Sequence, residues 1–212
     1  MTTGALDFKK SLPGYHAKRG VFEVVDVPPM HYLMIDGRGD PNTSREYAEA
    51  IACLFPVAYK LKFASKRDLQ RDYVVPPLEA LWWAEDMDSF TAARDKSHWQ
   101  WTAMLMAPEW ITREMFAHAV EQVRKASSPP KLDAMRFAEL SEGRCVQTLH
   151  VGSFEDEAPV LDSMHRDFIP AQGFHLSGKH HEIYFTDFRK VEPAKLRTIL
   201  RQPVAVGAGS SS

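Results

Sequence analysis

The segment KHHEIYFTD, residues 179–187, has the composition of a β-strand but carries side chains that do acid–base chemistry. Side chains alternate between the two faces of a strand, so His180, Glu182 and Tyr184 are expected on one face. His181 is expected on the other. Three interpretations of Glu182 compete: a metal ligand, a carboxylate held by structural hydrogen bonds, and a buried acid that serves a small-molecule ligand.

The metal interpretation is the weakest of the three. His181 and Glu182 are adjacent and point to opposite faces, so they cannot bind one ion from the same side. His180 and Glu182 share a face, but a third ligand would have to come from elsewhere. Neither His165 nor His175 has a recognisable metal-ligand spacing. We therefore expect no metal site and no other cofactor.

The five tryptophans are grouped, at positions 82, 83, 99, 101 and 110. Most tryptophans belong to the hydrophobic core, and that is the simplest interpretation here. Ligand pockets are also rich in aromatic residues, and a carboxylate among aromatic rings attracts flat organic cations.

Strand alternation then suggests which side chains share a groove with Glu182. A strand at 77–84 places Glu79 and Trp83 on one face, and a strand at 98–107 places Trp99 and Trp101 together. The apolar pair Ile183 and Phe185 is the better candidate to pack on helices. We therefore expect Glu182 and Tyr184 to face a groove, with walls supplied by Glu79, Trp83, Trp99 and Trp101.

The same order of elements is expected twice along the chain. The first half has strands at 21–27 and 31–39, a helix that opens with the capping-box spacing of Thr43 and Glu46 and kinks at Pro56, and strands at 77–84 and 98–107. The second half has strands at 135–140 and 145–151, a helix between Ser153 and Gly173 with Asp156 in its first turn, and a strand at 180–187.

Repetition of this kind indicates one α+β domain with two halves related by a pseudo-twofold axis and a ligand groove between them. We expect a single domain over residues 15–204, with repeats at about 20–107 and 134–203. A helix and a linker at 108–133 would join them, and 205–212 would be a flexible tail.

Composition excludes several classes of partner. Lys and Arg number 26 and Asp and Glu number 28, for a net charge of −2. Without a basic excess or a polybasic run, neither a nucleic acid nor a membrane is expected as a partner. Cys53 and Cys145 lie in apolar segments without a C-x-x-C spacing, so we expect buried thiols in a cytoplasmic protein. A monomer and a homodimer both remain open.

Several motifs together carry a resemblance to a known family. The segments PLEALWW (77–83) and KHHEIY (179–184), with VFEVVDVPPMHYLMIDGRGD (21–40) and HWQWTAMLMAPEWIT (98–112), resemble a stand-alone GyrI-like small-molecule-binding protein. Related domains are the effector-binding modules of AraC-type and multidrug-sensing regulators. The resemblance implies a duplicated β-α-β-β fold with a ligand cleft between the repeats. It also implies that Glu182 meets cationic or polar aromatic ligands.

A subfamily of such proteins hydrolyses the cyclopropane ring of DNA-alkylating natural products such as yatakemycin and uses an aromatic cage. By analogy, the cage here draws on Trp83, Trp101, Tyr184 and Tyr73. Glu182 would be the base that activates water, and Tyr184 would hydrogen-bond the group that gains charge. The alternative is a non-catalytic module that senses or sequesters cationic aromatic drugs, with Glu182 as the counter-charge.

Overall fold

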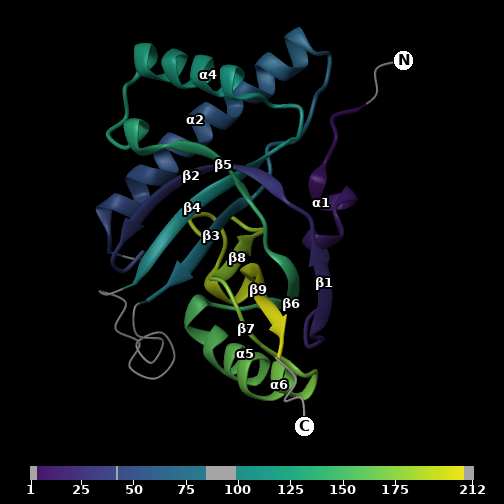
Figure 1. The fold of residues 1–212 in the computed structure, drawn as a ribbon. Helices are drawn as coiled ribbons and strands as arrows, with labels where there is room; N and C mark the ends of the chain where they lie inside the picture. Colours follow the sequence, from purple (N-terminus) through teal and green to yellow (C-terminus); the bar gives the residue numbers. More distant parts are fainter. Residues whose placement is uncertain (1–3, 42, 85–98, 208–212) are drawn as a thin grey trace.

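The computed structural model describes residues 4–41, 43–84 and 99–207. These residues form a mixed α+β structure around one large antiparallel sheet (Figure 1). Along the main path of the sheet the strand order is β1-β6-β9-β8-β3-β4-β2-β5, and the short β7 pairs with β9 outside that path. The α+β class expected from the sequence is therefore confirmed.

Most of the strands lie close to the expected ranges. They are β1 Glu23–Val27, β2 Met30–Arg38, β3 Leu78–Trp83, β4 Gln100–Ala107, β5 Arg136–Leu140, β6 Gly143–Val151, β7 Phe174–Leu176, β8 His180–Tyr184 and β9 Arg197–Val206. The sequence interpretation did not assign β7 or β9. In β9 the polar residues Arg197, Arg201 and Gln202 and the imino acid Pro203 interrupt the hydrophobic pattern by which strands are identified.

Exchanging each strand of one half with its counterpart in the other half gives the same strand order, read from the opposite edge of the sheet. The exchange pairs β1 with β5, β2 with β6, β3 with β8, and β4 with β9. The central pair, β3 and β8, joins the halves, while β1 pairs with β6 and β2 pairs with β5. A duplication would leave this order, although the duplication and the repeat boundaries remain predictions.

The long helix of the first half, α2, spans Arg45–Asp68. Its N-cap is Ser44, whose side chain accepts a hydrogen bond from the backbone N–H of Tyr47 at 3.4 Å, so the expected cap at Thr43 is wrong by one residue. Pro56 lies inside α2, which continues past it. The helix α4, Arg113–Ala126, packs beside α2 (Figure 1).

The expected second-half helix is a series of short helical segments. A 3₁₀ turn at Phe154–Glu157 leads into α5, Ala158–Asp162, a π-helical turn at Ser163–Phe168, and α6, Ile169–Ala171. Pro159 and Pro170 stand at the starts of α5 and α6, where a missing N–H costs little. The hydroxyl of Ser153 donates to Asp156 at 2.7 Å instead of capping backbone. Gly173, with φ of +73°, ends the series as expected.

The helices cover the face of the sheet that carries Glu182, which we call the helix face. The ring of Tyr47 on α2 lies 4.9 Å from the ring of Trp101. Leu200, the cross-strand partner of Glu182, packs in one apolar cluster with Met164 and Ile169. Paired residues share a face, so both helical blocks lie on the Glu182 side.

The opposite face is covered by the N-terminal segment, and we call it the N-terminal face. That segment contains α1, Phe8–Ser11, and a 3₁₀ turn at Pro13–Tyr15. The ring of Tyr15 meets the ring of Phe185 edge-on, with centroids 6.4 Å apart. The expectation that Ile183 and Phe185 pack on the helices is therefore wrong. Phe185 packs against the N-terminal segment instead, on the face that Ile183 shares, and no local pattern predicted that packing.

Two further expectations concern the environment of the chain. Cys53 and Cys145 are buried free thiols, as expected, and burial raises the pKa of the Cys145 thiol to about 12. Within the described ranges, no helix combines the length and apolar character that crossing a bilayer requires.

Candidate functional site

Glu182 ends a short chain of hydrogen bonds at the centre of the sheet. The hydroxyl of Tyr184, two residues along β8 and on the same face, donates to Glu182 Oε2 at 2.6 Å. The indole Nε1–H of Trp82 on β3 donates in turn to the hydroxyl oxygen of Tyr184 at 3.1 Å. The chain orients the carboxylate, because hydrogen bonds to a charged acceptor are short and directional.

Two histidines lie on the other side of this carboxylate. His180 Nε2 is 3.5 Å from Glu182 Oε1, and the His165 ring lies 6.3 Å from the His180 ring, nearly perpendicular to it. Burial, with a smaller contribution from His180, lowers the pKa of His165 to about 4, so its imidazole is neutral at pH 7. In the described part of the chain, His165 Nε2 has no hydrogen-bond partner.

Aromatic rings pack against Trp82 and Tyr184, the two residues that lead to Glu182 in this hydrogen-bonded chain. The Tyr47 and Trp82 rings are 5.7 Å apart, and the Phe154 ring meets the Tyr184 ring edge-on at 5.7 Å. Burial, followed by the nearby charge of Glu182, raises the pKa of both Tyr47 and Tyr184. Both phenols therefore remain protonated donors over the physiological pH range.

Trp101 belongs to this aromatic cluster through its contact with Tyr47, and its position depends on a glycine. It is fully buried, and its strand partner on β2 is Gly37. A Cβ atom on Gly37 would overlap the Trp101 ring. The Trp101 indole N–H has no hydrogen-bond partner among the described residues, so it is a buried donor beside the cluster.

A second carboxylate lies near Tyr184. Glu157, at the end of the 3₁₀ turn, is 5% exposed, and its charge adds to the rise in the pKa of Tyr184. The neighbourhood of Tyr184 therefore combines two acids with aromatic rings. Such surroundings favour ligands that are flat and neutral or cationic.

The structure brings together only part of the site expected from the sequence. Glu182, Tyr184, His180 and Trp101 share the helix face, and Trp99 joins them through Trp82, with ring centroids 5.8 Å apart.

Glu79 and Trp83 instead lie on the N-terminal face. The register pairs Ala80 with Glu182, which places Glu79 one residue out of step with it. Trp83 receives the ammonium of Lys179, 3.1 Å from its ring centroid. The prediction that Glu79 and Trp83 share a groove with Glu182 is therefore wrong.

Tyr73 also lies apart from the Glu182 cluster. It is buried between Phe8 and Trp110, with ring centroids 6.3 and 6.1 Å away. Its proposed place in the cage has no contact to support it.

Sequence reasoning did not assign Tyr47, Trp82, His165, Phe154 or Glu157 to the site. Tyr47 lies one residue after Glu46 in the expected first-half helix, and alternation along the strand at 77–84 separated Trp82 from Trp83. Choosing Trp82 over Trp83 required the cross-strand register, which no local pattern fixes.

Glu79 belongs to a buried ionic network on the N-terminal face. The hydroxyl of Tyr15 donates to Glu79 Oε1 at 2.5 Å, and His181 Nε2 lies 2.9 Å from Glu79 Oε2. His181 Nδ1 lies 2.9 Å from Glu142 Oε1, and the guanidinium of Arg201 donates to Glu142 Oε2 at 3.0 Å. Two acids and two cationic groups thus form one hydrogen-bonded chain.

The partners in this network set each other's protonation. Burial by itself would lower the pKa of His181, but Glu142 and Glu79 raise it overall. Burial by itself would raise the pKa of Glu142, but His181 and Arg201 lower it to about 2. Glu79 is therefore a carboxylate held by structural hydrogen bonds. This is the role that the sequence had left open for Glu182.

A metal site finds no support in the described geometry. No group of three His, Cys, Asp or Glu side chains in the described ranges is arranged to hold a metal ion. His180 and Glu182 approach each other, as the alternation requires, but a third ligand is not among their described neighbours.

Comparisons with known proteins agree with the fold and cover nearly the whole chain. A family model for the GyrI-like small molecule binding domain matches residues 21–205. A crystal structure of a conserved protein from Listeria innocua is 37% identical, covers 94% of this chain and all of its own, and superposes with a TM-score of 0.85. The structure of a hydrolase from Listeria innocua is 36% identical over 95% of this chain and 100% of its own, with a TM-score of 0.84.

A more distant structure extends the likeness in fold alone. The C-terminal domain of EcmrR has a TM-score of 0.53 at 11% identity and covers 88% of this chain and 98% of that domain. None of the curated protein sequences compared matches the chain.

Proposed function

The chain belongs to the GyrI-like family of small-molecule binding domains, and we propose that it binds a flat aromatic compound at Glu182 and opens a cyclopropane ring by adding water. The observation that carries the proposal is the hydrogen-bonded chain from Trp82 through Tyr184 to Glu182. The similarity to a hydrolase from Listeria innocua over nearly the whole chain supports it.

In this proposal Glu182 is the general base. One of its oxygens is held by Tyr184, and the other faces His180, so the carboxylate has a fixed orientation. Tyr184 uses its single hydrogen on Glu182, which makes it a group that positions the base in the resting state. A positioned base contributes on the order of 10²–10⁴ in rate.

The reaction balances with water as the only co-reactant. The water oxygen forms a bond to a carbon of the strained ring while Glu182 accepts the water proton. The carbon–carbon bond of the ring breaks, and its electron pair moves to the electron-withdrawing group of the substrate. That group then takes up a proton from solvent and Glu182 releases the water proton to solvent, so the product is the substrate plus one water and Glu182 is again a carboxylate. The proposed substrate is a small molecule, and neither a nucleic acid nor a membrane takes part.

The aromatic cluster and the neutral His165 would select the substrate. Tyr47, Trp82 and Trp101 form a cluster of flat apolar rings on the Glu182 face, and such a cluster would suit an extended aromatic compound of the yatakemycin type. His165 offers a neutral nitrogen next to His180 for a polar group of the ligand. The two free thiols agree with the proposed cytoplasmic location.

The decisive experiment incubates the protein with a yatakemycin-type cyclopropanoid and follows the compound by mass spectrometry. The wild-type protein should convert it catalytically to a product that is heavier by one water. Glu182→Gln should bind the compound and fail to convert it. Glu109→Gln, a change at an exposed carboxylate, is the matched control and should convert it normally. Equal conversion by Glu182→Gln would exclude Glu182 as the base.

A second candidate function is binding without chemistry, as a sensor or a sequestering protein for cationic aromatic compounds. It is favoured by Glu157, a second buried acid whose charge reaches Tyr184. Two acids among aromatic rings attract a flat cation through charge and through the ring faces.

Rhodamine binding, followed by quenching of tryptophan fluorescence, separates the two functions. Binding of rhodamine that weakens at least about tenfold in Glu182→Gln, with no water added to any cyclopropanoid, would favour the sensor. Unchanged affinity in that variant would reject Glu182 as the counter-charge.

A further inference from the structure

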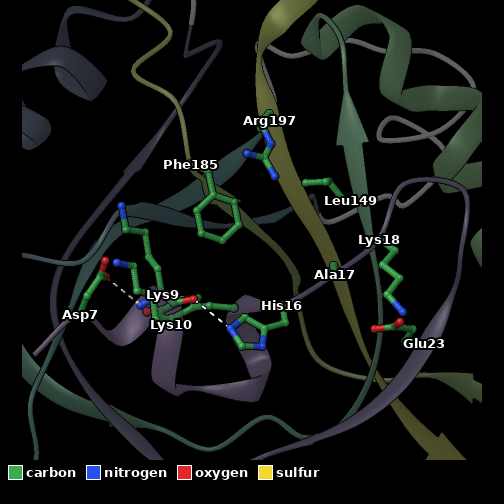
Figure 2. A pocket seen from close by; sticks show the side chains of 11 residues that line it. Asp7, Lys9, Lys10, His16, Ala17, Lys18, Glu23, Leu149, Phe185 and Arg197 are labelled. Carbon is green, nitrogen blue, oxygen red and sulfur yellow. Dashed lines mark hydrogen bonds between the residues drawn. The ribbon is translucent and has the colours of Figure 1, made fainter.

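A pocket lies on the N-terminal face of the sheet, the face that carries Phe185 (Figure 2). Its volume is about 580 Å³, within the range that holds a small organic ligand. The N-terminal segment forms one wall, and residues from β1, β6 and β9 and the residue that follows β8 form the other.

Cationic side chains dominate the pocket. Lys9, Lys10, Lys18 and Arg197 line it, and the two carboxylates in its wall are Asp7 and Glu23. Asp7 is engaged as the N-cap of α1, where it accepts from the backbone N–H of Lys9 at 3.1 Å.

The four cationic groups form no ion pair with the residues that the structure describes. In the described structure, none of the side chains of Lys9, Lys10, Lys18 and Arg197 has an acidic partner within 4.0 Å. Elsewhere on the surface, Arg and Lys side chains do pair with acids, as Arg189 does with Asp187 at 2.8 Å. Unpaired cations that converge on one pocket create a positive potential that a bound anion would neutralise.

The same pocket offers an apolar surface. Phe185, Leu149 and Ala17 line it, and Phe185 is held edge-on by Tyr15. In Figure 2 the guanidinium of Arg197 lies beside the Phe185 ring. An arginine next to an aromatic ring can pair with an acidic group while the ring packs on the rest of the ligand.

We propose that this pocket binds an aromatic anion, an aryl phosphate or aryl carboxylate. Arg197 and Lys9 pair with its acidic group, and Phe185 packs against its ring. The preference is opposite in sign to that of the Glu182 neighbourhood, where the nearby acids favour neutral or cationic ligands. The two sites lie on opposite faces of the sheet, because Phe185 and Glu182 are three residues apart along one strand direction, so a ligand in this pocket does not contact Glu182.

Isothermal titration calorimetry with 1-naphthyl phosphate tests the proposal on the full chain. The compound should bind, and higher salt should weaken it. Arg197→Gln and Lys9→Gln should each weaken binding at least about fivefold, and together at least about twentyfold. Lys195→Gln removes an exposed cation that pairs with Glu192 outside the pocket, so it should leave the affinity unchanged.

Two further measurements locate the ligand and make the result independent of the Glu182 site. Glu182→Gln should bind 1-naphthyl phosphate as the wild type does, and amide NMR shifts should concentrate at Ala17 and Leu149. Equal affinity in the Arg197 and Lys9 variants, or loss of binding in Glu182→Gln, would overturn the proposal. Inorganic phosphate that binds as tightly as 1-naphthyl phosphate would overturn the aromatic part.

Discussion

Glu79 and Glu182 lie on adjacent central strands but on opposite faces of the sheet, because the residue paired with Glu182 is Ala80. Glu79 is fully buried, and its two oxygens are taken by Tyr15 and His181. Glu182 is 8% exposed and accepts a hydrogen bond from Tyr184. A one-residue difference in register thus separates a structural acid from the acid proposed to serve the ligand.

Trp82→Phe should impair the Glu182 site while keeping an aromatic ring in place. The variant loses the indole N–H that donates to Tyr184, and a hydrogen bond of this kind is worth about 1 kcal/mol. We expect kcat/KM for water addition, or rhodamine affinity if the protein is a sensor, to fall about five- to tenfold.

The matched control for that variant is Trp110→Phe. The Trp110 indole donates to Ser65 at 2.9 Å and lies with Tyr73, away from Glu182. This change should leave both ligand measurements intact. Equal effects of the two variants would show that the Trp82–Tyr184 hydrogen bond has no special part in the site.

Gly37→Ala should disturb the position of Trp101 in the aromatic cluster. The added methyl group would overlap the Trp101 ring, which is packed against Tyr47. Overpacking of a core typically costs about 1–3 kcal/mol. We expect that loss in urea unfolding, together with a changed near-ultraviolet circular dichroism spectrum. Gly4→Ala is the control, because its methyl group meets nothing within 4 Å, and it should change neither the stability in urea nor the spectrum. An unaltered spectrum in Gly37→Ala would contradict the packing of Trp101 described above.

His181→Leu should be strongly destabilising. It removes the cation between Glu79 and Glu142 and leaves both carboxylates buried without that partner. Breaking a buried ionic network from one side costs about 3–5 kcal/mol. Urea unfolding at pH 7 measures the loss, and His175→Leu, at an exposed position, is the control. A loss below about 1 kcal/mol would mean that the two acids find other partners.

Acid should weaken the fold through Glu142. Its pKa is lowered from 4.5 to about 2 in the folded protein, so its contribution to stability is present above pH 4.5 and is lost as the pH falls toward 2. The shift corresponds to about 3 kcal/mol at 1.36 kcal/mol per pKa unit. His181, whose pKa is raised, contributes in the opposite sense, and its share is lost as the pH rises through its folded pKa.

Unfolding in urea between pH 6 and pH 2.5 checks the acid side of this expectation. Glu142→Gln should be less stable than the wild type near pH 6, and the gap should narrow as the pH falls. A constant gap across that range would show that the titration of Glu142 does not control acid stability.

The sequence by itself determined the local features of this protein. Period-two alternation placed His180, Glu182 and Tyr184 on one face of a strand, because successive side chains of extended backbone must point to opposite sides. Gly173 marked the end of the second helical region, since a positive φ favours glycine. Apolar surroundings and the absence of a paired spacing indicated buried thiols at Cys53 and Cys145.

Only the tertiary structure decided which residues share a site. The register of β3 against β8 selected Trp82 and rejected Trp83 and Glu79, and register is a non-local property that a single strand does not encode. Tertiary packing also decided that α2 covers the face with Trp101 and that the N-terminal segment covers the face with Phe185. Both faces of the central strands are buried, so local hydrophobicity could not show which one meets the helices.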